Sequence, residues 1–539
     1  MTSDLLASGL LDPVGSGARR PVIVAIMVFI GLSFLWIFSL ASAEDETVEA
    51  FYAANRSLPS TLNAFAIAGE QISILTLLGA SGLIAVFGYD GFALAVDGLL
   101  MLGVLLVLTQ RVHRKGRYTI GDIFARNKVN TRSRAAASVV TLTITVPVLI
   151  VQLRAAGASA ALLIGMPTPG VEVICTALTG AMVICYAVLA GMRGISIILA
   201  VKVPLVIGTL LLIAVLGLRK LDWQPMNVFS GAADRSVSPT IFLGSGLRPS
   251  GETVGWLNTV GMHVVVILGA AVMPPLIMRV SASRSGRAAR RATSSAAWLM
   301  GAFVVLLTAV GLEAAAIVGG RALNAGGASG QAALIQIASA LLTDGSTERA
   351  ALITLVACAI FTTVLTTVAS ATFTAAVSLA HDLRARGRSP EQGVSGVRMV
   401  RWSAVLVGLV GLVAATLVNR NATQFLATFS LTIAASCIFP TLLYSLFWAK
   451  FTERGLLWAV YGSLLLCILF TAFSPGMSGT SYALLPARSF NWFPLQTAGP
   501  VTVPLAFLLG WLGSVLPPSR EKAGIGKRRT APSRVRSTL

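Results

Sequence analysis

The chain is short of charged residues and of the side chains on which most enzymes depend. Of its 539 residues, 12% are charged, whereas soluble globular domains carry about 25%. So few charges cannot solvate the surfaces of several water-facing domains, which excludes a soluble multidomain protein. The three histidines are scattered, and the sequence contains no zinc-protease motif, no paired-carboxylate motif and no phosphate-binding loop. A membrane-embedded enzyme or the use of a nucleotide therefore has little support.

Acidic residues and cysteines are also scarce, while apolar residues are abundant. There are 21 Asp and Glu against 41 Lys and Arg, which gives a net charge of +20, and 55% of the residues are hydrophobic. A basic balance with this apolar excess indicates a polytopic membrane protein whose basic loops face lipid headgroups, rather than a nucleic-acid-binding protein. The cysteines lie in apolar runs without metal-ligand spacing and are expected to pack as small apolar residues: Cys175, Cys185, Cys358, Cys437 and Cys467.

Thirteen apolar runs are long enough to cross a bilayer as helices, a crossing that takes about 20 residues. They lie near 22–42, 64–86, 93–110, 137–163, 171–191, 197–217, 258–278, 294–318, 351–380, 402–418, 425–448, 456–473 and 500–516. The first run follows Arg19 and Arg20 and ends in Ala-Ser-Ala, which is similar to a signal-peptidase site. We expect a retained helix there, with a cleaved signal as the alternative.

Lys and Arg are distributed unequally between the two sides of these spans. With the N-terminus outside, the inner loops carry 29 of the 41 basic residues and the outer segments carry 10, while Arg154 and Lys202 fall within spans. The densest clusters, at 111–134, 279–291, 384–401 and 520–536, all fall inside, as the positive-inside rule requires. The sequence therefore predicts a multi-pass protein of the cell membrane with its C-terminus in the cytoplasm.

The second span is interrupted by polar residues at mid-membrane depth. Gly69 is followed by Glu70, Gln71 and Ser73, and each polar group is costly in hydrocarbon. A glycine beside such groups favours a locally unwound helix, whose freed backbone carbonyls can coordinate a small cation. The alternative is that Ser73 and Thr76 bond back to their own helix and that the glycines only allow close packing.

The ninth span carries a cluster of threonines. Thr363, Thr366 and Thr367 are spaced i, i+3 and i+4 and share one helix face. One carbonyl and two hydroxyls from this face, with two carbonyls from the broken second span, would give about five neutral oxygens, a set that suits Na⁺. Back-bonding of the threonines to their own helix is again the alternative.

The seventh span ends in the pair Pro274 and Pro275, which removes two helix donors and predicts a kink. Interrupted helices in comparable positions of two halves are typical of transporters built from inverted repeats. Spans two to six and seven to eleven would form these halves, each with five helices. The expected organisation is an N-terminal segment with the first span and an acidic cytoplasmic loop (1–63), the first repeat (64–217), an extracellular loop (218–257), the second repeat (258–448), two additional spans (449–517) and a basic cytoplasmic tail (518–539).

Two basic residues lie inside predicted spans. Lys202 either snorkels to the interface, faces the carboxylate of a solute, or substitutes for a cation near the ion site. Arg154 lies deeper, where a charge costs at least about 2.5–3.5 kcal/mol unless it is paired. It either forms an internal ion pair, with Glu70, Asp97 or Glu313 as available partners, or anchors a solute carboxylate.

Several segments resemble the sodium:solute symporter family. They are residues 51–57 (FYAANRS), 66–73 (AIAGEQIS), 78–82 (LGASG), 88–91 (GYDG) and 116–122 (GRYTIGD). Residues 273–279 (MPPLIMR), 381–383 (HDL), 433–437 (IAASC) and 439–440 (FP) look most like the cation/acetate, or short-monocarboxylate, branch. The order and spacing of these motifs, over residues 51–465, carry the resemblance.

The resemblance implies an all-α, leucine-transporter-like fold of two inverted five-helix repeats with flanking helices. It places a Na⁺ site on the carbonyls of Gly69, Ile72 and Thr363 and on the hydroxyls of Thr366 and Thr367, in agreement with the oxygen count above. Small apolar residues are expected at 366 and 367 in the acetate branch, so the two threonines favour Na⁺ over H⁺ as the coupling ion.

The predicted activity is secondary active symport, in which a Na⁺ gradient drives uptake of a short monocarboxylate such as acetate, propionate or pyruvate. No cofactor and no obligate protein partner are expected. The candidate solute contacts are Gln71, Ser73, Gln152, Arg154 and Lys202. His263 is expected to be a packed polar residue, and His381 with Asp382 to make capping and cytoplasmic-gate contacts. Proton coupling, another solute such as an amino acid or a sugar, a channel and a sensor remain as alternatives.

Overall fold

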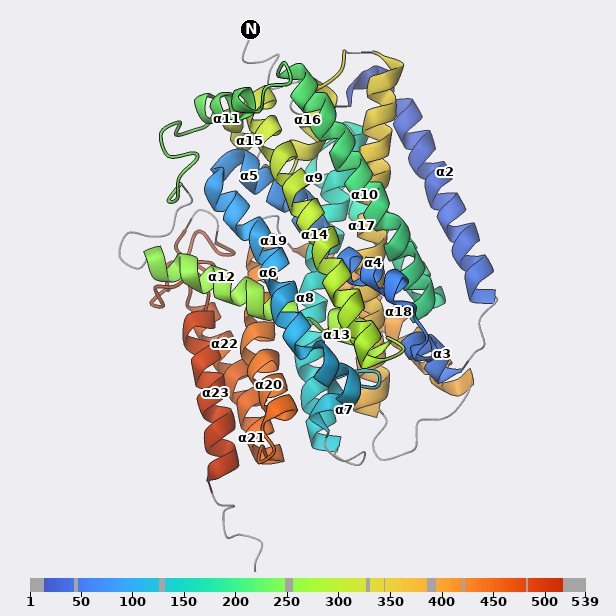
Figure 1. Ribbon diagram of the computed structural model, residues 1–539, viewed down its shortest axis with the longest axis vertical. Coiled ribbons are helices and arrows are strands. Elements are labelled where there is room, and N and C mark those ends of the chain that lie inside the picture. The colour runs from blue at the N-terminus through green and yellow to red at the C-terminus, as the bar shows by residue number, and fades with distance from the viewer. Residues whose placement is uncertain are drawn as a thin grey trace, which may run out of the picture.

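The computed structural model describes residues 14–42, 47–125, 131–247, 255–325, 330–343, 345–384, 394–418, 422–480 and 483–516. Within these ranges every named element is a helix, as an all-α membrane protein requires, because a helix satisfies its own backbone groups where no water is present. Figure 1 shows an elongated bundle in which most helices run along the long axis.

The first part of the chain forms the following helices: α2 (Gly15–Ser42), α3 (Val48–Ala53), η1 (Ala54–Arg56), α4 (Ser60–Gln71), η2 (Leu75–Ala80), α5 (Ser81–Phe87), α6 (Tyr89–Lys115), α7 (Ile120–Phe124), α8 (Thr131–Ile164), α9 (Pro169–Leu189), α10 (Met192–Lys220) and α11 (Pro225–Asp234). The second part forms α12 (Gly255–Ala271), α13 (Pro274–Ser281), α14 (Gly286–Ala314), η3 (Ala315–Gly319), α15 (Gly320–Ala325), α16 (Ala333–Ala340), α17 (Thr347–Ser378), η5 (Leu379–Arg384), α18 (Val394–Leu417), α19 (Ala422–Ile433), η6 (Ala434–Ile438), α20 (Phe439–Phe447), α21 (Glu453–Leu457), η7 (Trp458–Gly462), α22 (Ser463–Ala472) and α23 (Gly499–Val515).

Ten helices of the described chain are long and apolar enough to cross a membrane, or eleven if the bent pair Ser60–Gln71 and Leu75–Phe87 counts as one span. α23 is a shorter apolar helix, and α2 covers the first predicted run. Every apolar run of the sequence therefore falls on a helix or a helix pair, but the number of thirteen spans stays a prediction.

Two of the helices are interrupted where the sequence predicted breaks. α4 and the helix that follows it meet at an angle of 59°. α12 ends at Ala271 and α13 begins at Pro274, with Met273 in an extended conformation between them. The first residues of a helix have no intrahelical partner for their N–H groups, so the prolines that begin α13 lose no hydrogen bond and the break costs little.

The interrupted helix α4 lies deep in the bundle. It packs against α10 and α14 and reaches α13 and α17, while α17 in turn packs against α8, α10 and α18. α17 is buried without interruption from Thr362 to Ser378. Small residues allow helices of the bundle to approach closely. For example, a Cβ at Gly311 of α14 would clash with Ile84 of α5.

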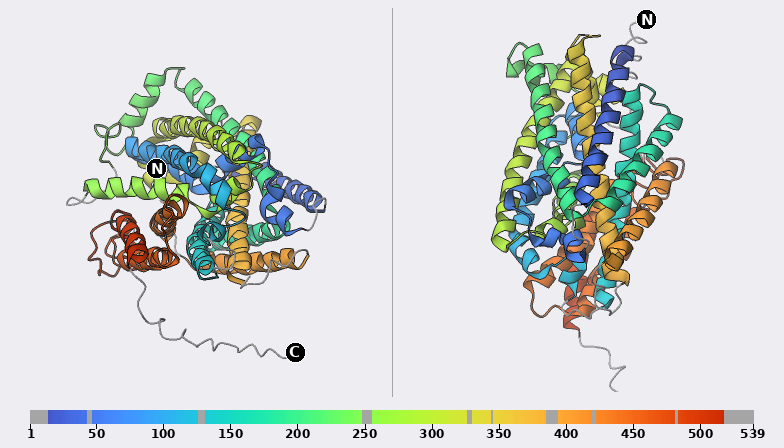
Figure 2. Two further views of the ribbon diagram at one scale, coloured as in Figure 1. Left: turned by 60° about the horizontal axis from the view of Figure 1, so that its bottom comes forward. Right: turned by 90° about the vertical axis from the view of Figure 1, so that its right-hand side faces the viewer.

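The described residues of three of the four basic clusters, apart from the buried Arg279, lie toward one end of the bundle, the lower end in Figure 1, where α3 and α7 lie. Arg134 is paired with Asp382, and Arg284 Nε donates to the Ser57 carbonyl at 2.6 Å. Seen from the lower end and from the side, α2 and α23 lie far apart on the bundle (Figure 2). The cluster at 520–536 lies outside the described residues. This shared end agrees with the predicted one-sided charge; that it faces the cytoplasm stays a prediction.

Candidate functional site

The first feature of the site is the break after α4. Its last residue is Gln71, and the π-helical segment η2 resumes at Leu75. Thr76 stabilises the break, because its Oγ1 accepts from the Ser73 N–H at 2.7 Å and donates to the Gln71 carbonyl at 2.9 Å. These bonds satisfy backbone groups that have left the helix. The predicted unwinding is thereby confirmed, and the predicted local bonding of Ser73 and Thr76 is part of what maintains it.

A cavity of about 240 Å³ lies beside this break. Most of its wall is apolar and comes from α6, α8, α12, α14 and α19. The polar side chains that line it are few: Glu70, Gln71, Ser73, Thr76, Thr145, Gln152 and Thr367. Three of the predicted solute contacts and one predicted ion ligand therefore surround one cavity. A few polar groups in an apolar wall are the usual form of a small-molecule site.

The predicted ion ligands on α17 are buried and bonded within their own helix. The Thr366 hydroxyl donates to the Thr362 carbonyl at 2.8 Å, and the Thr367 hydroxyl donates to the Thr363 carbonyl at 2.7 Å. A hydroxyl that donates still has lone pairs for a cation, so back-bonding and ion binding are compatible. The Thr363 carbonyl also accepts from Thr366 at 3.1 Å, which makes it the most occupied of the predicted ligands on this helix.

The two residues of α4 and its break that were predicted as ion ligands, Gly69 and Ile72, both contact α10. A Cβ at Gly69 would lie 3.0 Å from Leu199 Cδ2, so only glycine allows this approach without a shift. The Ile72 carbonyl accepts a hydrogen bond from the Lys202 ammonium group at 2.9 Å. Lys202 is fully buried and therefore does not snorkel. The ammonium group of Lys202 thus binds the Ile72 carbonyl oxygen, which the sequence predicted to be a Na⁺ ligand.

Arg279 is the central buried cation of the site, and the sequence analysis missed it. Its Nε donates to Glu70 Oε2 at 2.8 Å, and its two terminal nitrogens donate to the hydroxyls of Ser196 at 3.0 Å and Ser370 at 3.1 Å. Ser370 in turn donates to Glu70 Oε2 at 2.8 Å. Arg279 thus joins α4, α10, α13 and α17, although the charge count had placed it in a cytoplasmic loop. The unexplained carboxylate of Glu70 was the signal that could have indicated such a partner.

Arg154 and Asp97, two further charged residues of the spans, are paired away from this network. Arg154 lies 3.3 Å from Glu172 of α9, and both side chains are buried. An internal ion pair was one of the two alternatives for Arg154, but its partner is none of the three residues named. Asp97, one of those three, is bonded to His263 Nδ1 at 2.7 Å. His263 is thus hydrogen-bonded as well as packed. Sequence distance gave no reason to prefer Glu172, because pairing across neighbouring helices depends on their rotation.

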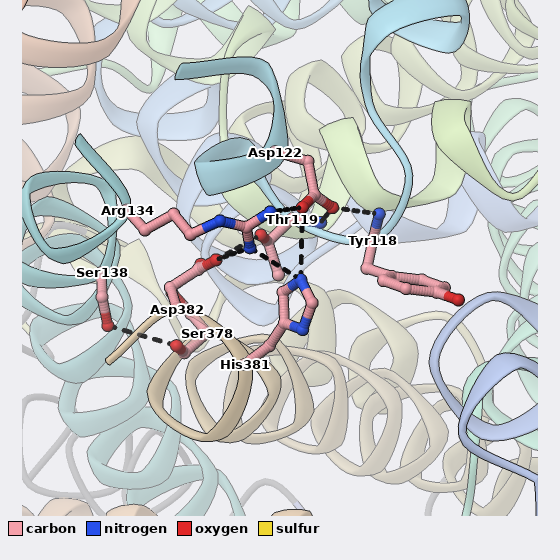
Figure 3. Close-up of polar contacts among 8 residues, drawn as sticks. All are labelled: Tyr118, Thr119, Asp122, Arg134, Ser138, Ser378, His381 and Asp382. Carbon is pink, nitrogen blue, oxygen red and sulfur yellow. Dashed lines mark hydrogen bonds and ion pairs between the residues drawn. The ribbon is translucent and has the colours of Figure 1, made fainter. Parts of the chain in front are cut away.

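A second polar cluster joins α7, α8, the end of α17 and η5 (Figure 3). Arg134 contacts Asp122 at 2.7 Å and Asp382 at 3.5 Å, and its NH1 lies 3.0 Å from His381 Nε2. The Thr119 hydroxyl donates to Asp382 at 2.8 Å. His381 and Asp382 thus tie separate helices together, and their expected capping and cytoplasmic-gate role stays a prediction.

The charge of Asp122 is stabilised within this cluster. Burial raises the pKa of its carboxyl group, but the hydrogen bond and charge of His381, the charge of Arg134 and the Tyr118 N–H together hold this pKa well below its ordinary value. Asp122 is therefore an anion that pairs with Arg134 of α8 and bonds His381 of η5.

Comparison with known proteins shows what the chain is similar to. A model of the sodium:solute symporter family matches residues 51–462. The chain is 30% identical over 523 residues to the monocarboxylic acid transporter of Corynebacterium glutamicum, covering 94% of this chain and 93% of that protein. It is 28% identical to the uncharacterized symporter YwcA of Bacillus subtilis, covering 91% of this chain and 93% of that protein.

A solved structure of a substrate-bound, outward-open Na⁺-coupled sialic acid symporter superposes with a TM-score of 0.67 at 15% identity, covering 94% of this chain and 98% of the other. The structural neighbours have the leucine-transporter fold, which agrees with the fold that the resemblance implied. They are transporters and not enzymes, and the family match extends over most of the chain. The protein is a multi-pass membrane transporter and belongs to the sodium:solute symporter family.

Proposed function

We propose that this transporter couples the inward movement of Na⁺ to that of a short monocarboxylate such as acetate, propionate or pyruvate. The observation that carries the proposal is the cavity beside the α4 break, where Gln71, Ser73, Gln152 and Thr367 meet. Its volume of about 240 Å³ is below the roughly 300–1,000 Å³ of pockets for drug-sized ligands, so it suits an acid of a few carbon atoms. The similarity to a monocarboxylic acid transporter supports the same class of solute.

The buried charges next to the cavity favour an anion. Glu70 lines the cavity, and Arg279 is hydrogen-bonded to Glu70. The Lys202 ammonium group donates to the carbonyl of Ile72, the residue that follows Gln71. Before Na⁺ binds, these three side chains carry a net charge of +1, which one carboxylate neutralises. An uncompensated charge in a low-dielectric interior is costly, so a monoanion is the solute best matched to this centre.

In the proposed complex the carboxylate binds the polar groups of Gln71, Ser73 and Gln152, and Lys202 contributes its charge to the same centre. Arg154 has no part in it, because its charge is satisfied by Glu172. Na⁺ binds at the edge of the same cavity, on the carbonyls of Gly69, Ile72 and Thr363 and the hydroxyls of Thr366 and Thr367. The position of Thr367 in the cavity wall supports this arrangement.

Transport would follow from the movement of two inverted five-helix repeats, α4 to α10 and α12 to α20, with the N-terminus outside and the C-terminus in the cytoplasm. Their interrupted first helices, α4 and α12–α13, support this division. The Arg134–Asp122–Asp382 cluster keeps the lower end closed in this conformation. Movement of one helix set against the other separates these groups and opens the cavity to the cytoplasm.

The test is uptake of labelled acetate, propionate and pyruvate into proteoliposomes under imposed Na⁺ or H⁺ gradients. We expect saturable uptake of at least one acid that an inward Na⁺ gradient stimulates. Uptake that follows only the H⁺ gradient would show the alternative coupling ion. Competition by an amino acid or a sugar but by none of the acids would refute the solute class, and a flux that does not saturate would indicate a channel.

A further inference from the structure

The starting observation is the position of the Lys202 ammonium group. It donates to the Ile72 carbonyl at 2.9 Å, and its side chain is fully buried between α10 and α4. Ile72 is the residue at which α4 leaves its helical path, with backbone angles of −77° and 81°. A carbonyl at such a break has lost its helical donor and is open to a cation. In this conformation the cation that it binds is a side chain of the protein.

The surroundings of Lys202 supply one negative and one positive charge. Glu70 of α4 and Arg279 of α13 act on it electrostatically, and Glu70 already accepts hydrogen bonds from Arg279 and Ser370. α17 contributes the Ser370 hydroxyl, which bonds Arg279 and Glu70, and the carboxylate of Glu313 on α14 lies beside Gly217, toward the other end of α10. Glu70 is therefore bonded to other groups, and the direct hydrogen-bond acceptor of Lys202 is the Ile72 carbonyl.

Na⁺ at the proposed site would need the same carbonyl oxygen. With a hard-cation coordination distance of about 2.3–2.6 Å added to the 2.9 Å bond of Lys202, the two cations would lie at most about 5.5 Å apart. At an effective dielectric constant of about 20, their repulsion lowers the affinity for Na⁺ by about a hundredfold. The ammonium group and Na⁺ cannot both be well bound there.

We propose that Lys202 is a built-in cation that competes with Na⁺ for the Ile72 carbonyl and thereby determines how tightly the transporter binds its coupling ion. With Lys202 in place, the break is filled and the buried charges already match one carboxylate. Na⁺ enters when the ammonium group leaves the carbonyl, so the two cations alternate on α4. The inference rests on the sodium site of the proposed function and assigns to it a specificity-determining residue.

The test compares Na⁺ binding to the purified full-length protein in nanodiscs, measured with radioactive Na⁺ at one pH. Lys202→Met removes the charge and keeps a long flexible side chain, while Lys202→Arg keeps the charge. Lys220→Met is a matched control, because Lys220 lies on the same helix and its ammonium group also bonds a backbone carbonyl, that of Ala340. Lys202→Gln serves as a second neutral variant if Lys202→Met does not fold.

We expect Lys202→Met to bind Na⁺ about a hundredfold more tightly than the wild type, and Lys202→Arg and Lys220→Met to differ from it by less than about threefold. Unchanged or weaker Na⁺ binding in both neutral variants would overturn the inference. A parallel measurement of labelled monocarboxylate exchange in the absence of any gradient separates the two proposals. If the wild type shows no exchange of labelled monocarboxylate, the solute assignment is refuted. The role of Lys202 is decided by the Na⁺ affinities alone.

Discussion

The ion pair of Glu70 and Arg279 allows the energetics of the site to be tested by a double-mutant cycle. Both side chains are almost fully buried, and the Nε–Oε2 distance is 2.8 Å. Removing one partner of such a pair leaves a buried charge uncompensated and costs about 3–5 kcal/mol. Glu70→Gln and Arg279→Gln should each lower the free energy of unfolding by that amount. The double variant should cost about 3 kcal/mol less than the sum of the two, at the upper end of measured coupling energies.

The assay is denaturant unfolding of the purified protein in mixed micelles, for the wild type, both single variants and the double variant. Arg117 and Glu49 provide the control, because their 3.5 Å pair is exposed, with 54% and 46% of the side chains accessible. An exposed pair contributes about 0–1 kcal/mol, so its cycle should show a small coupling energy. If the coupling of Glu70 with Arg279 were no larger than that of this exposed pair, Arg279 would not be the partner that stabilises the buried Glu70 carboxylate.

Two further predictions concern the ion site and the lower polar cluster. Thr367→Ala removes one proposed Na⁺ ligand, and since a bond to a charged group is worth about 1.5–3 kcal/mol, the Na⁺ concentration for half-maximal uptake should rise about 10- to 100-fold. Thr362→Ala, whose hydroxyl bonds the Cys358 carbonyl, should leave it unchanged, and equal effects would contradict the assignment. Asp122 has a lowered pKa in the folded protein, so its charge stabilises the fold above about pH 4, and this contribution is lost as the pH falls further. Asp122→Asn should therefore lower the unfolding temperature at pH 7 and differ less from the wild type below pH 4, whereas a constant difference would exclude this electrostatic role.

The positions of the helices along the chain followed from the sequence because hydrophobic length is a strong constraint in a membrane. Apolar runs of about 20 residues mark spans regardless of how the helices pack. Polar interruptions were equally informative, since Glu70, Gln71 and Ser73 have no inexpensive place in a regular lipid-facing helix. The break after Gln71 and the cavity beside it lie where those residues predicted a site.

Partners across helices were harder to predict, because they depend on helix rotation and depth. Arg279 follows a pair of prolines at the end of an apolar run and was counted as a loop residue, but α13 continues to Ser281 and keeps its guanidinium inside the bundle. Glu172 lies in the first turn of α9 and was not considered for Arg154. In both cases the sequence indicated that a buried charge needed a partner, and only the packing identified that partner.

The central claim is that one protein moves Na⁺ and a short monocarboxylate together. The most direct measurement is uptake of radioactive Na⁺ into proteoliposomes that is driven by an inward gradient of acetate or pyruvate, with no initial Na⁺ gradient and with the membrane potential clamped. We predict that the Na⁺ concentration inside the proteoliposomes rises above that outside while the acid gradient lasts. Movement of the acid without any accumulation of Na⁺ would contradict it.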